Sequence, residues 1–369
     1  MLSSSERGPD SARVRGRDVA VAALAAFLWI FVSLLPLRAI PRAAEEAPGL
    51  DAHIYIAMAE SPSVFTMPPF GYRIGAPLLA RLLPLPLEAA FFTVTALSLL
   101  AVSLFAYLLL REWGFDHELS LLGLGFVAAA PEVTRFLNNY FLVDAAAVAG
   151  TALLLLGIER RWSSGAMAFL LLIASLVKET AFFVLPVLYL RLALPRLVDG
   201  RAAAQTLLVA LPALASAFWL RLGWGGASTG FPYLTPWSVP RRAWFGSYVS
   251  YQDIWVNLFG FLGLLAAANA FTAEGRAFLR RYWPYLALVL AQLIVPRNSD
   301  RLLFFAFPVV IPLALLELLR MKDSLSDWFP LLGTLLVFCY LFLPGQLAFP
   351  IGLVLLSRLL LEWRRGREA

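Results

Sequence analysis

Apolar residues in this chain gather into long runs, which short polar segments rich in arginine separate. A helix of about 20 apolar residues crosses a bilayer, and we count about twelve runs as candidate spans. The runs cover 19–37, 88–110, 119–131, 141–158, 164–177, 181–195, 204–222, 254–271, 283–296, 302–319, 328–343 and 347–361. The pattern predicts an all-α, polytopic transmembrane protein.

Two of these assignments have alternatives. The runs 164–177 and 181–195 are short, and together they could form one hairpin that enters the membrane and returns, which would preserve the topology of all later spans. The run 19–37 is longer than the roughly 7–15 residues of a signal-peptide core, and no clean small-x-small cleavage site follows it. We therefore predict that it is a retained span.

Composition supports a membrane protein. Of 369 residues, 60% are hydrophobic and 15% charged, and mean hydropathy is +0.76. Soluble domains have about 45–50% apolar and about 25% charged residues, so this chain lacks the polar surface of a soluble enzyme. The single cysteine, Cys339, cannot form an internal disulfide, and His53 and His117 are too few and too far apart for a His-rich zinc site.

The basic residues predict an orientation. The net charge of +6 comes from arginines that punctuate apolar segments and form no patch, which does not indicate a nucleic-acid partner. Their distribution places both termini in the cytoplasm of a multi-pass protein of the cell membrane. We predict a tail at 1–18, one transmembrane domain at 19–361 with external loops 38–87 and 223–253, and a tail at 362–369.

With this topology, unusual polar residues fall on the outer side. They include Asp51, Glu60, Tyr72, Arg73, Glu132, Arg135, Asp144, Lys178, Glu179, Asp253, Arg297, Asp300 and Arg301. Charges near membrane depth are costly and are usually kept for function, so we predict a polar cavity that opens outward. In the first external loop we expect two short amphipathic helices, with Asp51 and Tyr55 on one face of the first.

Each of these signals also has a purely structural interpretation. Asp51 could cap its helix, and Asp144 could cap a helix or pair with an arginine. Lys178 and Glu179 could form a local salt bridge that anchors a loop. The segment 297–301 could be a solvated loop with its own ion pair.

These motifs resemble those of the GT-C superfamily of membrane glycosyltransferases, which use lipid-phosphate sugars. The resemblance lies in the order of the motifs along the chain and in their predicted location on the same side of the membrane. The resemblance is to small prokaryotic members without a C-terminal soluble domain and covers about residues 19–320. The motifs are Asp51, Tyr55, Pro69–Phe70, Arg73 and Pro77 in the first loop, then Asp144, Lys178–Glu179, Asp300–Arg301 and Phe307–Pro308. The first loop has one aspartate where some branches have an adjacent acidic pair.

The resemblance implies a transfer of sugar from a polyprenyl-phosphate donor to a hydroxyl of a glycan, lipid or protein acceptor. Asp51 would be the general base, with Asp144 as a second catalytic carboxylate. Arg73, Lys178, Arg297 and Arg301 would bind the donor phosphate, and Tyr55, Tyr72, Glu179 and Asp300 would position substrates.

A metal is not required by this scheme. Carboxylates such as Asp51 and Asp144 are compatible with a divalent cation, but no cluster in the sequence demands one, so we predict no essential cofactor. The rival hypothesis is a transporter or flippase for a lipid-linked or anionic solute, which would also gather charges within the membrane. Another membrane transferase, such as an acyltransferase, is a further alternative.

Overall fold

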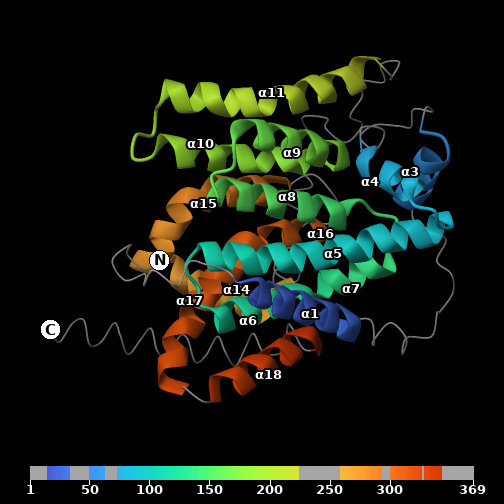
Figure 1. Cartoon of the computed structure of the whole chain (residues 1–369). Helices are drawn as coiled ribbons and strands as arrows, with labels where there is room; N and C mark the ends of the chain where they lie inside the picture. The colour runs from blue at the N-terminus through green and yellow to red at the C-terminus, as the bar shows by residue number, and fades with distance from the viewer. Residues whose placement is uncertain are drawn as a thin grey trace, which may run out of the picture.

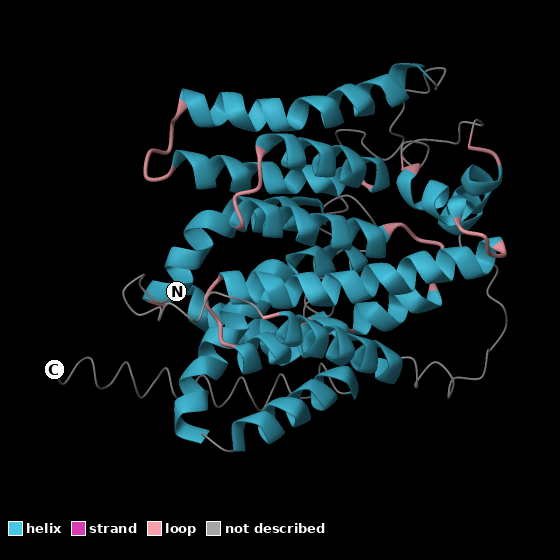
Figure 2. Cartoon of the chain, in the orientation of Figure 1, coloured by secondary structure: helices cyan, strands magenta, loops and turns pink. Residues whose placement is uncertain are grey.

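The computed structural model describes residues 15–33, 50–62, 73–223, 258–292, 300–325 and 328–342. The described chain is helical throughout, with no strand among these residues (Figure 2). Residues 1–14 of the predicted N-terminal tail, the predicted C-terminal tail, the loop 223–253 beyond its first residue and the span 347–361 lie outside the described residues. So do Tyr72, Arg297 and the side chains of Asp51 and Asp300. The predicted end of the N-terminal tail at residue 18 is wrong, because helix α1 (Gly16–Ser33) already begins at Gly16.

The helices form a stack whose members run roughly side to side in Figure 1, from α11 at the top to α18 at the bottom. The first half contains α1 (Gly16–Ser33), α3 (Leu50–Glu60), α4 (Gly75–Leu82), α5 (Leu87–Glu112), α6 (His117–Ala128), α7 (Pro131–Asn138), α8 (Asp144–Glu159) and α9 (Ser164–Val177). The second half contains the 3₁₀ helix η2 (Glu179–Val184), α10 (Leu185–Ala193), α11 (Gly200–Gly223), α14 (Gly260–Ala270), α15 (Ala273–Gln292), α16 (Asp300–Leu303), η3 (Phe304–Ala306), α17 (Phe307–Leu325) and α18 (Phe329–Phe342).

Polar caps and prolines set several helix starts. Asp116 accepts a hydrogen bond from the Leu119 N–H at 2.9 Å before α6, and Ser163 accepts one from the Ala166 N–H at 3.3 Å before α9. These side chains satisfy N–H groups that have no partner within the helix. Pro131 opens α7, because proline at a first helical position has no N–H to leave unpaired.

The predicted spans agree with the structure in part. Four helical segments are long and apolar enough to cross a membrane: Gly16–Ser33, Leu87–Glu112, Gly200–Leu220 and Arg301–Arg320. The pair α6 and α7, bent by 43° at its break, makes a fifth if it is counted as one span. Several other apolar helices of the described chain are shorter, among them α9, α14 and most of α18.

Buried and exposed apolar surface divides the helices into centre and rim. In the most apolar part of Arg301–Arg320, 89% of the residues are buried, whereas the share is 22% in α1 and 22% in the segment Gly200–Leu220 of α11. α8 is alanine-rich and buried along almost its whole length, where it packs between α5 and α9. The outer faces of α1 and α11 expose large apolar side chains, including Phe27 and Trp219. Such faces are unfavourable in water and suit lipid, which is consistent with a membrane protein.

Candidate functional site

A carboxylate held by two cations lies at one end of the helix stack. Asp144 is the first residue of α8, and its Oδ1 is 2.5 Å from the Lys178 Nζ. Its Oδ2 is 3.4 Å from Nη1 of Arg301, which lies in α16. The side chains of Asp144 and Lys178 are only 4% and 6% exposed, so water screens this pair little. The Lys178 Nζ also lies 5.5 Å from the centre of the Phe305 ring, a cation–π distance.

A second group of polar side chains adjoins the first through the chain neighbours Lys178 and Glu179. The Arg73 guanidinium binds the Glu179 carboxylate through two nitrogens, with Nε donating to Oε2 at 3.0 Å and Nη2 contacting Oε1. Its Nη1 donates to the hydroxyl of Tyr55 in α3 at 3.4 Å. Tyr55 is buried, whereas the Glu179 side chain is 46% exposed. The network therefore runs from the protein interior to an accessible surface.

Local backbone geometry brings these residues together. Helix α9 ends at Val177 because Lys178 is extended, with φ −163° and ψ 143°, and η2 begins at Glu179. Gly75 opens α4 against this chain end: a Cβ built there would lie 2.8 Å from the Val177 side chain and 3.0 Å from its backbone nitrogen. Only a residue without a side chain permits this approach, which places Arg73 beside Glu179.

Among the described residues of the network, cations outnumber carboxylates. Three cations, Arg73, Lys178 and Arg301, share two carboxylates, Asp144 and Glu179. Partial removal from water alone would raise the pKa of Glu179, but the Arg73 guanidinium outweighs it and holds the pKa below its usual value. The pKa of Arg73 is raised: burial opposes its charge, and the Glu179 carboxylate more than compensates. Both side chains remain charged at neutral pH.

Six of the predicted site residues thus meet in one network: Tyr55, Arg73, Asp144, Lys178, Glu179 and Arg301. We call it the outer-end network, after the side of the membrane on which the sequence predicts these residues to lie. Asp51 lies one turn before Tyr55 in α3, so its position shares a face with Tyr55. Asp300 begins α16 next to Arg301.

The structural alternatives fare differently. Asp144 does pair with an arginine, Arg301, as that interpretation expects, and it does not serve as an N-cap, a position that Val143 occupies. A local Lys178–Glu179 pair is not what the structure has, because the two side chains bind distant partners, Asp144 and Arg73.

Two residues of the site escaped the sequence prediction. Phe305 contacts the Lys178 ammonium, and Gly75 permits the close approach of α4 and α9. The sequence did contain a signal for Gly75, which stands two residues after Arg73 at the start of an apolar helix. Glycine has low helix propensity, so its presence there indicates a need for close packing. Phe305 had none, since phenylalanine is abundant in this chain.

Among the described residues, no three His, Cys, Asp or Glu side chains are grouped to hold a metal ion. Asp144, one of the carboxylates compatible with a divalent cation, is occupied by Lys178 and Arg301.

Comparison with known proteins assigns no family. No protein-family model matches the sequence, and no curated protein is significantly similar to it. Fold and site define a class only: an all-helical protein with apolar helices long enough to cross a membrane and a buried, cation-rich network at one end of the bundle.

Proposed function

We propose that this protein is a membrane glycosyltransferase that moves a sugar from a polyprenyl-phosphate donor to an acceptor hydroxyl. The observation that carries the proposal is the outer-end network, in which three cations from three separate segments converge on two carboxylates. A phosphate leaving group develops negative charge as the glycosidic bond breaks, and fixed cations stabilise that charge. The class of reaction is the one that the GT-C resemblance implies.

Arg73, Lys178 and Arg301 are the proposed donor-phosphate ligands, together with Arg297. Carboxylates orient three of these cations: Glu179 holds Arg73, and Asp144 holds Lys178 and Arg301. Cations fixed before the substrate arrives need no reorganisation during the reaction, which makes them more effective than flexible ones. Planar guanidinium groups also suit bidentate contact with phosphate oxygens.

Asp51 is the proposed general base, and Asp144 takes a different part. Because Asp144 already engages two cations, its lone pairs are directed at Lys178 and Arg301 rather than at an acceptor proton. We therefore assign Asp144 to orienting the phosphate ligands. Asp51 stands in the first turn of α3, where the helix dipole favours the ionised form that a base requires.

Tyr55, Tyr72, Glu179 and Asp300 are proposed to position substrates, with a glycan, a lipid or a protein as the acceptor. We propose no essential metal. We further propose about twelve membrane crossings, some by helices shorter than a full span, with both termini cytoplasmic and the outer-end network on the external side of the cell membrane.

The test is sugar transfer by the purified protein from a polyprenyl phosphate that carries a radiolabelled hexose or pentose. Asp51→Asn should fold normally, because Asp51 lies inside α3 and Asn and Asp have similar helix propensities, yet turnover should fall about a hundredfold. Glu60→Gln is the matched control, since it removes an exposed carboxylate from the last turn of the same helix and should leave turnover unchanged.

Two results would contradict the proposal. Transfer by Asp51→Asn at a rate close to that of the unsubstituted protein would place the base elsewhere. Movement of the labelled lipid between the leaflets of a vesicle, without any transfer of sugar, would favour the transporter hypothesis instead.

A further inference from the structure

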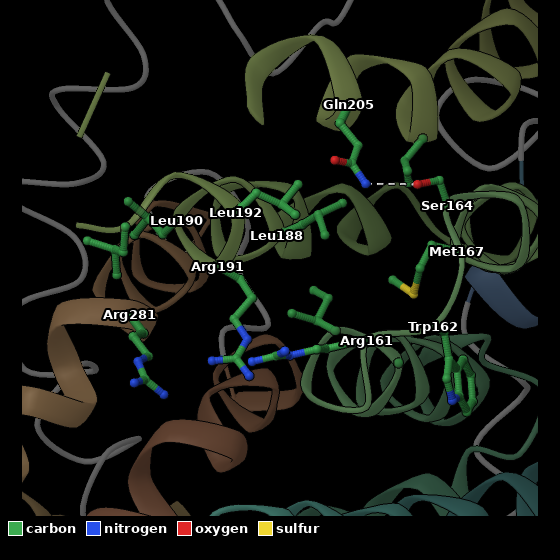
Figure 3. Close-up of a pocket in the computed structure, with 14 residues that line it drawn as sticks. Arg161, Trp162, Ser164, Met167, Leu188, Leu190, Arg191, Leu192, Gln205 and Arg281 are labelled. Atoms are coloured by element: carbon green, nitrogen blue, oxygen red, sulfur yellow. Dashed lines mark hydrogen bonds between the residues drawn. The ribbon is translucent and has the colours of Figure 1, made fainter. Parts of the chain in front are cut away.

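A cavity of about 570 Å³ lies at the other end of α8 from the outer-end network. Its walls come from the end of α8, the start of α9, and parts of α10, α11 and α15 (Figure 3). Since α8 has 16 residues, this cavity and Asp144 are separated by about 20 Å along the helix axis. The cavity is therefore distinct from the outer-end network.

Three arginines face this cavity. The guanidinium groups of Arg161, Arg191 and Arg281 extend into the same space, each from a different segment (Figure 3). Arg191 has a carboxylate nearby, Glu159, with Nη2 to Oε2 at 4.0 Å. Within the described residues, the side chains of Arg161 and Arg281 form no ion pair or hydrogen bond. Three like charges in one concavity repel one another unless an anion joins them.

Arg161 occupies a backbone position that favours glycine. Its φ is +55°, in the left-handed region that residues other than glycine adopt rarely. The Trp162 N–H donates to the Gly157 carbonyl at 2.9 Å, and the Arg161 N–H donates to the Ile158 carbonyl at 3.2 Å. This is the Schellman arrangement that ends helices, in which glycine usually stands where Arg161 does. The backbone thus gains nothing from an arginine here, while the cavity gains a cation.

The remaining walls complete an amphipathic site. Ser164 and Gln205, linked by a hydrogen bond of 3.0 Å, provide polar groups, and the first turn of α9 adds the positive end of a helix dipole. Leu188, Leu192 and Val209 line the cavity with apolar surface, and Leu192 is 36% exposed. A cationic mouth beside an apolar, partly exposed wall matches a phosphate that carries an acyl or prenyl chain.

We propose that this cavity binds the phosphate group of an anionic membrane lipid through Arg161, Arg191 and Arg281. Paired guanidinium groups bind phosphate oxygens in bidentate fashion, and basic pockets between membrane helices recognise acidic lipid headgroups. The leucine-lined wall accommodates the beginning of the hydrocarbon chain.

The experiment measures binding of short-chain phosphatidylglycerol to the full chain in neutral detergent, with short-chain phosphatidylcholine and inorganic phosphate as comparison probes. We expect phosphatidylglycerol to bind at least tenfold more tightly than either comparison probe. Arg161→Gly should weaken that binding at least tenfold while the thermal transition stays or rises, because glycine suits the left-handed backbone. Arg281→Gln should also weaken it. Arg201→Gln, which removes one cation from the start of α11 outside the cavity, should change binding less than twofold.

Each other outcome has a definite meaning. Unchanged binding by both Arg161→Gly and Arg281→Gln would overturn the proposal, as would equal binding of the two lipids. Inorganic phosphate that binds as tightly as phosphatidylglycerol would overturn the assignment to a lipid. None of these measurements involves sugar transfer, so the lipid site and the glycosyltransferase proposal are tested independently.

Discussion

The ion pair between Asp144 and Lys178 makes a quantitative prediction about stability. Asp144→Asn leaves the buried Lys178 ammonium and the Arg301 guanidinium without their carboxylate. Removing one partner of a buried pair costs about 3–5 kcal/mol, and we place Asp144→Asn in this range. Lys178→Met should cost less, because Asp144 keeps Arg301 at 3.4 Å and the methionine fills a similar volume against Phe305.

The double variant separates the pair from its surroundings. With both charges removed, no buried charge of the pair remains unpaired, so the combined cost should fall short of the sum of the single costs by about 1–3 kcal/mol. The assay is reversible unfolding of the purified protein in mixed micelles, followed by near-UV circular dichroism. Lys178→Met and the double variant keep the test informative if Asp144→Asn alone does not fold.

The pair of Arg160 with Glu112 is the comparison. It joins Nε to Oε1 at 2.7 Å, but its side chains are 32% and 29% exposed. Surface pairs contribute about 0–1 kcal/mol, so the coupling in the cycle Arg160→Gln with Glu112→Gln should lie in that range. If the coupling of Asp144 with Lys178 is no larger than this, burial does not strengthen the pair and the reasoning is refuted.

Three further predictions concern the same end of the bundle. Since the pKa of Glu179 is lowered, its pairing with Arg73 stabilises the fold above the usual glutamate pKa of 4.5 and is lost as the pH falls through the lowered value. The difference in thermal transition between the unsubstituted protein and Glu179→Gln should therefore be constant from about pH 8 to about pH 5 and shrink below about pH 4. A difference that grows on acidification would contradict the lowered pKa of Glu179. Gly75→Ala should destabilise the protein by about 1–3 kcal/mol in chemical unfolding, because the new methyl group would lie 2.8 Å from a side chain at the end of α9. Gly165→Ala is the control and should not destabilise, since nothing lies within 4 Å of its new methyl group. Equal effects of the two substitutions would disprove the close approach of α4 and α9. In a cysteine-free background, Glu60→Cys should react with an impermeant thiol reagent added to intact cells, and protection there would contradict the predicted orientation.

The apolar runs were enough to predict that the chain is helical and to locate most of its helices. The run 88–110 became α5, and 204–222 lies within α11, because a continuous apolar segment of this length satisfies its backbone only as a helix in lipid. Other boundaries were wrong. The run 119–131 ends as α6 at Ala128, and Pro131 starts a separate helix, α7, that no run predicted. Helix α15 begins at Ala273, ten residues before the run 283–296. Hydropathy does not register a proline break or an amphipathic extension, so these boundaries depend on packing.

The sequence also indicated which polar residues are unusual, because a charge within an apolar segment is costly wherever the segment folds. It could not determine which charge pairs with which. Asp144, Lys178 and Arg301 are separated by up to 157 residues, and their contact depends on how α8, α9 and α16 meet. The cavity lined by Arg161, Arg191 and Arg281 had no sequence signal, since each arginine alone is typical of the residues that flank a span. Only the tertiary structure decides that three such residues face one space, because side-chain direction follows from helix ends and helix packing rather than from composition.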